Sequence, residues 1–265
     1  MKKDTRGRTA FISIAFTLLR CKPIAQIASR FFGSYERVWD ILAMTERDAV
    51  DAILGGVKDE EEFDSAGEKT AETLRKLVTS EDVVLDVGCG IGRIEKSLAK
   101  YCAEIHGVDV SKRMAKLARK RLKGFGNVYI HKNNGRDLSL FPDDKFDCVF
   151  SIDVFQHLEK EDAVFYLYEI HRVLKPNGKL YFNVPNFLNE GNFRTFMDKY
   201  VKNPSSRTVI KMRYYCPEEV KKILISIGFS IVSLRTGTYI EVLARESVKI
   251  DLKQEQQRIQ IESVH

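Results

Sequence analysis

A glycine-rich segment between a buried strand and a helix is the part of the sequence best suited to chemistry. It reads Asp86-Val87-Gly88-Cys89-Gly90-Ile91-Gly92-Arg93. Glycines let the backbone approach a ligand closely, and the first N–H groups of the helix that follows favour an anionic group. Asp109 lies 21 residues after Gly88, at the end of the next apolar run, where a carboxylate can accept hydrogen bonds from both ribose hydroxyls. Together these features predict a nucleoside cofactor.

The glycine spacing distinguishes between nucleoside cofactors. Dinucleotide sites use G-x-G-x-x-G, whereas the spacing here is G-x-G-x-G, and Arg93 occupies the position of the third glycine. Asp86 stands two residues before the first glycine, where a carboxylate repels a pyrophosphate and attracts an amino group. The segment therefore favours an amino-acid nucleoside, and an NAD-dependent oxidoreductase is the disfavoured alternative.

The elements that must position these residues alternate from residue 82 onward. Short apolar runs predict strands over 83–87, 106–110, 128–131, 146–151, 179–184, 229–234 and 239–244. Helical patterns cover 92–101, 111–123, 160–174 and 217–227, preceded by two further helices over 35–54 and 63–78. This alternation predicts βαβ units in a largely parallel sheet, and the last two runs read as a hairpin.

With these elements placed, the chain resembles class I S-adenosylmethionine-dependent methyltransferases. The resemblance covers about residues 82–184 closely and the C-terminal helix and hairpin loosely. It depends on five segments in order, at 84–93, 107–111, 134–138, 146–158 and 172–178. The chain departs from the family pattern at Asn134, where many relatives have Asp, and at Asn177, where glycine is usual.

The resemblance implies a fold, a cofactor and a set of binding residues. The fold is α/β and Rossmann-like: a seven-stranded, mostly parallel sheet with an antiparallel last strand and helices on both faces. The cofactor is S-adenosyl-L-methionine. The residues expected to bind it are Asp86, Gly88, Cys89, Gly90, Gly92, Arg93, Asp109, Val110, Met114, Asn134, Gly135, Arg136, Ser151 and Ile152.

The acceptor of the methyl group is less well defined by the sequence. The fourth strand ends in Ser151-Ile152-Asp153-Val154, which is not the N/D-P-P-Y/F of amide- and adenine-methylating relatives. A hydroxyl acceptor needs a base, for which His157 and Asp153 are the candidates; otherwise they are turn or cofactor-side residues. Phe187, Tyr214 and Tyr215 are expected in the substrate pocket, and Phe187, Phe193 and Phe196 in an apolar lid. The other strand and helix histidines are expected to be structural: His106, His131 and His171.

The excess of basic over acidic residues in the 265-residue chain is concentrated at its N-terminus. Residues 1–37 hold eight basic and two acidic residues, which leaves 35 of each sign elsewhere, so a nucleic-acid surface on the main domain is not indicated. We predict a basic amphipathic arm over 1–37, a methyltransferase domain over 38–246 with a substrate lid at 185–213, and a polar tail over 247–265. The arm fits an amphipathic helix on an anionic membrane or acidic partner, or a transit peptide, and it also fits a helix packed on the main domain or a partly disordered segment, which is the simpler interpretation.

The cysteine pattern bears on the compartment. Five cysteines without C-x-x-C spacing favour reduced thiols and predict neither a disulfide framework nor a metal site. We therefore expect a cytoplasmic methyltransferase, with membrane contact through the arm, that methylates an oxygen or nitrogen of a small molecule. The alternatives are an RNA or protein methyltransferase and a non-catalytic module that binds S-adenosylmethionine.

Overall fold

The computed structural model describes residues 34–57, 59–202 and 211–247. Its helices are α3 (Tyr35–Leu42), α4 (Glu46–Ile53), α5 (Glu60–Leu74), α6 (Glu95–Leu98), α7 (Lys112–Arg121), α8 (Lys160–Val173), α9 (Glu190–Phe196) and α10 (Pro217–Ile227). Shorter helical turns are η1 (Ala99–Tyr101), η2 (Phe155–His157) and η3 (Met197–Val201). The strands are β1 (Val83–Val87), β2 (Glu104–Asp109), β3 (Val128–Lys132), β4 (Phe146–Ser151), β5 (Leu174–Pro185), β6 (Phe229–Thr236) and β7 (Tyr239–Glu246).

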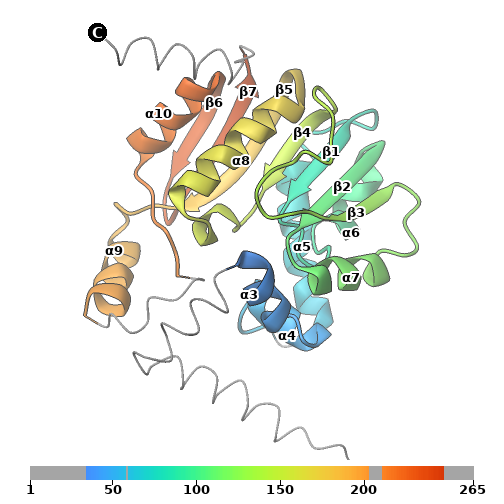
Figure 1. Ribbon diagram of the computed structural model, residues 1–265, viewed down its shortest axis with the longest axis horizontal. Helices are drawn as coiled ribbons and strands as arrows, with labels where there is room; N and C mark the ends of the chain where they lie inside the picture. The colour runs from blue at the N-terminus through green and yellow to red at the C-terminus, as the bar shows by residue number, and fades with distance from the viewer. Residues whose placement is uncertain (1–33, 58, 203–210, 248–265) are drawn as a thin grey trace, which may run out of the picture.

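The seven strands form one sheet in the order β3-β2-β1-β4-β5-β7-β6 (Figure 1). β1 to β5 pair in parallel, whereas β7 is antiparallel to both β5 and β6. The predicted fold class, including the antiparallel last strand and the hairpin that supplies it, is confirmed. Most of the predicted arm and nearly all of the tail lie outside the described residues.

Alternate residues of β1 point into two apolar cores, because side chains along a strand alternate between its faces. Leu85 and Val87 pack with residues of α8 and α10, while Val84 packs with residues of α5 and α6. Figure 1 shows α8 on the near face of the sheet and α5 and α6 behind it. Both faces of the central strand are therefore covered, and a polar residue in it is costly to bury.

The helix predicted over 35–54 is two helices. The first ends at Leu42, with Ala43 as its C-cap, and Thr45 caps the second: its hydroxyl accepts the N–H of Asp48, and the Asp48 carboxylate accepts the N–H of Thr45. This capping box starts α4 independently of α3. The boundary predicted after residue 37 accordingly falls inside α3.

Two other elements begin earlier than predicted. α5 starts at Glu60, because the side chain of Asp59 accepts the N–H of Glu62 and the acidic run forms the first turn. β5 begins at Leu174, which pairs with Phe146 before the register shifts. Conversely, the helix predicted over 92–101 is only the short α6 and η1.

Candidate active site

A cavity lies at the carboxyl ends of β1, β2 and β4, beneath α3. Residues predicted to bind the cofactor line it, and so do both candidate bases. These residues are Gly88, Gly90, Arg93, Asp109, Val110, Met114, Gly135, Ile152, Asp153 and His157. The structure thus brings the two ends of the predicted reaction into one space.

The glycine loop is held against the end of β2 by its own backbone. The N–H groups of Gly88 and Cys89 both donate to the carbonyl of Val108, at 2.8 and 3.0 Å. Gly88 has φ +91°, and a Cβ there would overlap the side chain of Val154. Only glycine therefore fits this turn, which brings the loop after β1 against the loop after β4.

Asp109 is fixed by the same loop. Its Oδ2 accepts the N–H of Gly90 at 3.0 Å, and its Oδ1 accepts the N–H of Ser111 at 2.8 Å. Burial raises the pKa of Asp109 to about 7, although these two hydrogen bonds oppose the shift. Each oxygen keeps a further lone pair, so the ionised carboxylate can still accept a ribose hydroxyl on either side.

Asp86 does not line the cavity. It is 2% exposed and lies beside the fully buried Glu95, in the first turn of α6. Burial, reinforced by repulsion from Glu95, raises the pKa of Asp86 well above its usual range, and burial raises that of Glu95 to about 7. The pair therefore retains a proton near neutral pH. A direct contact between Asp86 and the cofactor stays a prediction, and sequence reasoning did not single out Glu95.

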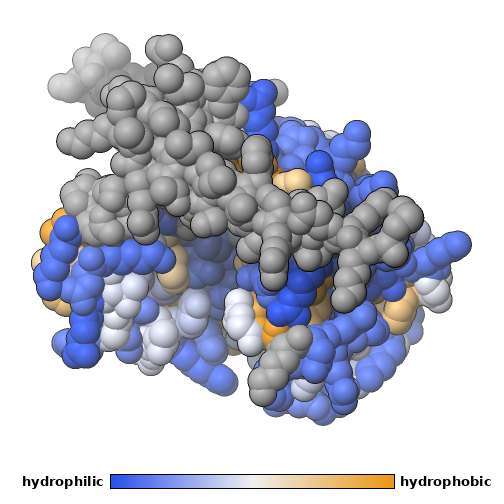
Figure 2. Space-filling view, turned by 90° about the horizontal axis from the view of Figure 1, so that it is seen from below, coloured by the Kyte–Doolittle hydropathy of each residue, from blue (hydrophilic) through white to orange (hydrophobic). Residues whose placement is uncertain are grey.

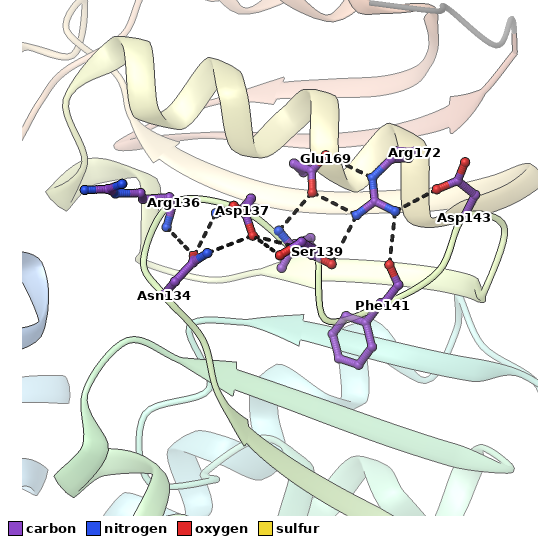
Figure 3. A network of polar contacts seen from close by, with 9 residues as sticks. Asn134, Arg136, Asp137, Ser139, Phe141, Asp143, Glu169 and Arg172 are labelled. Carbon is purple, nitrogen blue, oxygen red and sulfur yellow. Dashed lines mark hydrogen bonds and ion pairs between the residues drawn. The ribbon is translucent and has the colours of Figure 1, made fainter.

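The loop between β3 and β4, where the adenine edge is expected, lines the cavity, but not through Asn134. The Asn134 Oδ1 accepts the N–H groups of Arg136 and Asp137, and its Nδ2 donates to Asp137 (Figure 3). These bonds close an Asx turn, leaving Asn134 exposed. The neighbouring Asn133 and Gly135 line the cavity instead.

Two residues of α8 hold this loop in place, as Figure 3 shows. The Glu169 carboxylate accepts the N–H of Leu138 at 2.9 Å. Arg172 donates to Glu169, to Asp143 and to the carbonyls of Phe141 and Leu138. The loop therefore has a defined shape without a helix of its own.

The other predicted cofactor residues lie off the cavity wall. Ser151 is buried, and its hydroxyl donates to the Val87 carbonyl at 2.9 Å, which ties β4 to β1. Cys89 is also buried. Gly92 packs so closely against Leu122 that a Cβ at this position would overlap it. Arg136 is exposed. Their positions indicate that they shape the loops, and contact with the cofactor stays a prediction.

The acceptor end of the cavity holds Asp153, Gln156 and His157. The His157 ring packs edge-on against Trp39, with centroids 5.2 Å apart. Gln156 is 7% exposed, and its Nε2 lies 3.2 Å from the Asp153 carbonyl and 3.3 Å from His157 Nε2. The two candidate bases therefore share this part of the wall with an amide that the sequence did not single out.

The residues predicted for the substrate pocket and lid lie elsewhere. Tyr215 belongs to the buried core, while Phe187, Phe193, Phe196 and Tyr214 pack ring against ring, with centroids 5.2 to 6.2 Å apart. None of them lines the cavity described here. A group of aromatic residues in the sequence is compatible both with rings that pack against one another and with rings that line a substrate pocket, so the sequence could not distinguish the two.

Helices α3 and α4 cover the cavity in place of that lid. Tyr35 and Trp39 from α3 and Ala52 and Ile53 from α4 line it. The sequence predicted a helix here without indicating which side it packs on; the single Trp, Trp39, was the available signal.

Side-chain bonds at both ends hold α3 across the cavity. At one end, the Asp40 carboxylate accepts the Ser111 hydroxyl at 2.6 Å and the N–H of Arg113 at 3.0 Å. At the other, the Tyr35 hydroxyl donates to Asp162 at 2.6 Å and accepts the N–H of Glu159 at 2.9 Å. Helix α3, the cap of the cavity, is thus anchored to the start of α7 at one end and to the start of α8 at the other.

The remaining histidines are placed away from the cavity wall. His106 Nδ1 lies 3.0 Å from His131 Nε2, and burial lowers the pKa of both, that of His131 to about 4. His171 lies 3.9 Å from Glu246. Among the described residues, no group of three or more His, Cys, Asp or Glu side chains is arranged to hold a metal ion, and no helix combines the length and apolar character that crossing a bilayer requires.

Known proteins resemble this chain in sequence. Residues 85–182 match the family described as "Methyltransferase domain". Demethylmenaquinone methyltransferase of Tropheryma whipplei is 38% identical over 103 residues, which are 39% of this chain and 41% of the relative, so the chain spans well under two thirds of that protein. Phosphoethanolamine N-methyltransferase of Plasmodium falciparum is 30% identical over 184 residues, 68% of this chain and 66% of the relative.

Solved structures resemble it in fold. The magnesium protoporphyrin IX methyltransferase of Synechocystis, solved with bound S-adenosylhomocysteine, superimposes with a TM-score of 0.61 at 21% identity. The match covers 81% of this chain and all of that one. Strand order, glycine loop, Asp109 and sequence match agree: the chain belongs to the class I S-adenosylmethionine-dependent methyltransferases.

Proposed function

We propose that this protein transfers a methyl group from S-adenosylmethionine to an oxygen or nitrogen of a small molecule. The observation that carries the proposal is the shared cavity, whose wall includes Asp109 and the glycine loop together with Asp153 and His157. The cofactor residues fit an adenosine joined to methionine, because the half-buried Asp109 carboxylate can accept ribose hydroxyls and the glycines beside it let a ligand approach the backbone closely.

When bound, S-adenosylmethionine supplies an electrophilic methyl group on a sulfonium. The chain's residues then have three tasks: Asp109 and the glycine loop orient the cofactor, α3 excludes water, and Asp153 or His157 accepts the proton that the acceptor loses. Methyl transfer needs little covalent help, so alignment and exclusion of water provide much of the rate.

The names of the relatives support a small-molecule acceptor. The matched proteins are named for demethylmenaquinone and phosphoethanolamine, and a further one, 34% identical over 124 residues, is a sterol 4-C-methyltransferase of Caenorhabditis elegans. These acceptors differ in charge and polarity, so the relatives support the class and leave the acceptor open.

We further propose a cytoplasmic protein whose basic arm contacts an anionic membrane surface. The support is the arm sequence, in which four basic residues precede the apolar stretch 10–19 and four more follow it. Figure 2 shows the described part of the face below α3 and α4 as mainly hydrophilic, with apolar residues in small areas, so the arm carries the proposal. Co-sedimentation with anionic vesicles tests it, using a variant that lacks residues 1–33 and keeps α3 intact. Equal partitioning of both proteins would contradict membrane contact.

Two measurements test the proposed function. Calorimetry with S-adenosylhomocysteine should give saturable one-to-one binding. Transfer of a labelled methyl group should then be detected to at least one member of a panel that contains a naphthoquinol, phosphoethanolamine, a sterol, RNA and denatured protein. Labelling confined to RNA or protein would favour the macromolecular alternative, and binding with no transfer to any acceptor would favour the non-catalytic module.

A further inference from the structure

Asp153 has an unusual backbone conformation for a residue on the cavity wall. Its φ is +61°, in the left-handed region, which strains any residue with a Cβ. The other non-glycine residues with positive φ among the described residues are Asp144 and Asn177, and both are exposed and lie away from the cavity. At Asp153 the strain coincides with the candidate acceptor site.

Asn183 of β5 holds Asp153 in this conformation. The Asn183 Oδ1 accepts the N–H of Asp153 at 2.7 Å, and the Asn183 Nδ2 donates to Asp153 Oδ1 at 2.9 Å. Asn183 itself is fixed by the pairing of β5 with β4 and β7 on either side. One amide thus binds both the backbone and the side chain of Asp153, which leaves that carboxylate little freedom to rotate.

The second carboxylate oxygen is left for a ligand. Among residues 34–57, 59–202 and 211–247, no hydrogen bond to Asp153 Oδ2 is found, although Asp153 lines the cavity. The charge is nonetheless felt by its neighbours: it favours the protonated form of Arg93 against burial, and it adds to the effect of burial in raising the pKa of Tyr239.

The topology places this oxygen near the point of methyl transfer. Asp109, at the end of β2, would hold the ribose, and the glycine loop after β1 would hold the methionine part of the cofactor. β4 is the next strand in the sheet, and Asp153 follows it. Asp153 therefore lies next to the loop that would hold the methyl donor, since a Cβ on Gly88 would already meet the neighbouring Val154.

We propose that Asn183 is a positioning residue that presents Asp153 Oδ2 to the acceptor atom, so that the site selects an amine nitrogen or hydroxyl oxygen that gains positive charge as the methyl group arrives. This inference rests on the proposed function. As the carbon–sulfur bond breaks and the carbon–nitrogen or carbon–oxygen bond forms, the acceptor becomes cationic and then loses its proton to the Asp153 carboxylate. A fixed carboxylate aimed at developing positive charge lowers the barrier without reorganising.

Sinefungin tests the inference without knowledge of the acceptor, because it carries an ammonium-bearing carbon in place of the methyl sulfonium. We expect the wild-type protein to bind sinefungin at least about tenfold more tightly than S-adenosylhomocysteine, through one charge-assisted hydrogen bond. In Asp153→Asn and Asn183→Ala the ratio of the two affinities should fall to about one. An unchanged ratio in both variants would overturn the proposal.

The exchange variant Asp153→Asn/Asn183→Asp separates positioning from simple packing. It keeps both hydrogen bonds, with donor and acceptor side chains exchanged, but moves the negative charge from position 153 to 183. The melting temperature should return to the wild-type value, and the affinity for S-adenosylhomocysteine should return to within about twofold of wild type. The preference for sinefungin should stay lost. Recovery of that preference would show that the pair matters only for packing.

Two comparisons complete the experiment. Asp144→Ala changes an exposed left-handed aspartate remote from the cavity, and should leave the affinity ratio unchanged. A wild-type protein that binds neither compound would refute the proposed function. One that binds S-adenosylhomocysteine without preferring sinefungin would refute the role of Asp153 and Asn183 alone.

Discussion

The two ends of the cavity are built differently. The cofactor end comes from neighbouring parts of the chain: backbone amides of the glycine loop bond to Val108 and Asp109, 19 or 20 residues further on. The acceptor end brings together α3, η2 and β5, which are more than a hundred residues apart at the extremes. A local, backbone-built site keeps its shape under substitution, whereas an assembled one depends on single side chains. This difference should appear in the effects of mutations.

The largest effect is expected at the cofactor end. Asp109→Ala removes hydrogen bonds to a charged acceptor, worth about 1.5–3 kcal/mol each. Affinity for S-adenosylhomocysteine should fall by roughly ten- to a hundredfold or more in calorimetry. Glu72→Ala, which changes an exposed acid on α5, is the control. Unchanged affinity with an intact fold would show that Asp109 is misassigned.

The pH dependence of cofactor binding should report on the same residue. Because the pKa of Asp109 is raised to about 7 in the free protein, a bound ribose that needs the ionised form favours loss of the proton. Affinity should therefore rise between pH 5.5 and 7, by on the order of tenfold, and level off above. Asp109→Asn should bind more weakly and without this rise. A rise that persists in the variant would assign the titration to another group.

At the acceptor end, Trp39→Ala tests dependence on one side chain. The variant loses an aromatic contact with His157 that is worth about 0.5–1.5 kcal/mol, and it opens the cap. The KM for the acceptor should rise by about three- to tenfold, with a smaller change in S-adenosylhomocysteine affinity. Ile41→Ala, which alters an exposed residue of the same helix, should change neither. Equal losses for both ligands would mean that α3 serves the whole cavity.

The smallest effect is expected in the pH dependence of the free energy of unfolding, through the buried pair Asp86 and Glu95 beside the glycine loop. The pKa of Glu95 is about 7 in the folded protein against 4.5 unfolded, so the native state holds a proton that the unfolded state releases. That proton makes the native state less stable as pH rises from about 4.5 to 7. Glu95→Gln should remove this decline and raise the free energy of unfolding at pH 8 by on the order of 1 kcal/mol, with little change at pH 4.5. Lower stability of the variant at pH 8 would contradict the buried pair.

The same difference explains what could be predicted from the sequence. The sheet, the glycine turn and Asp109 are encoded by short patterns whose meaning does not depend on distant residues. The cap was missed because the pattern over 35–54 specifies a helix but not its neighbour, and Asn183 because its partner lies 30 residues away in the chain. The role of the insertion stays a prediction: Phe187 and Tyr214 pack against one another and do not line the described cavity, and an aromatic pattern in the sequence cannot distinguish such packing from a substrate pocket.

The position of α3 also connects the arm to the chemistry. Ser34 alone separates residue 33 from Tyr35, which forms part of the cavity wall and bonds to the start of α8. A displacement of residue 33 would therefore act on the cavity wall through the first turn of α3. If the arm binds a membrane as proposed, its attachment would bear on the cavity wall through Tyr35, and truncation of the arm would be expected to alter turnover as well as binding.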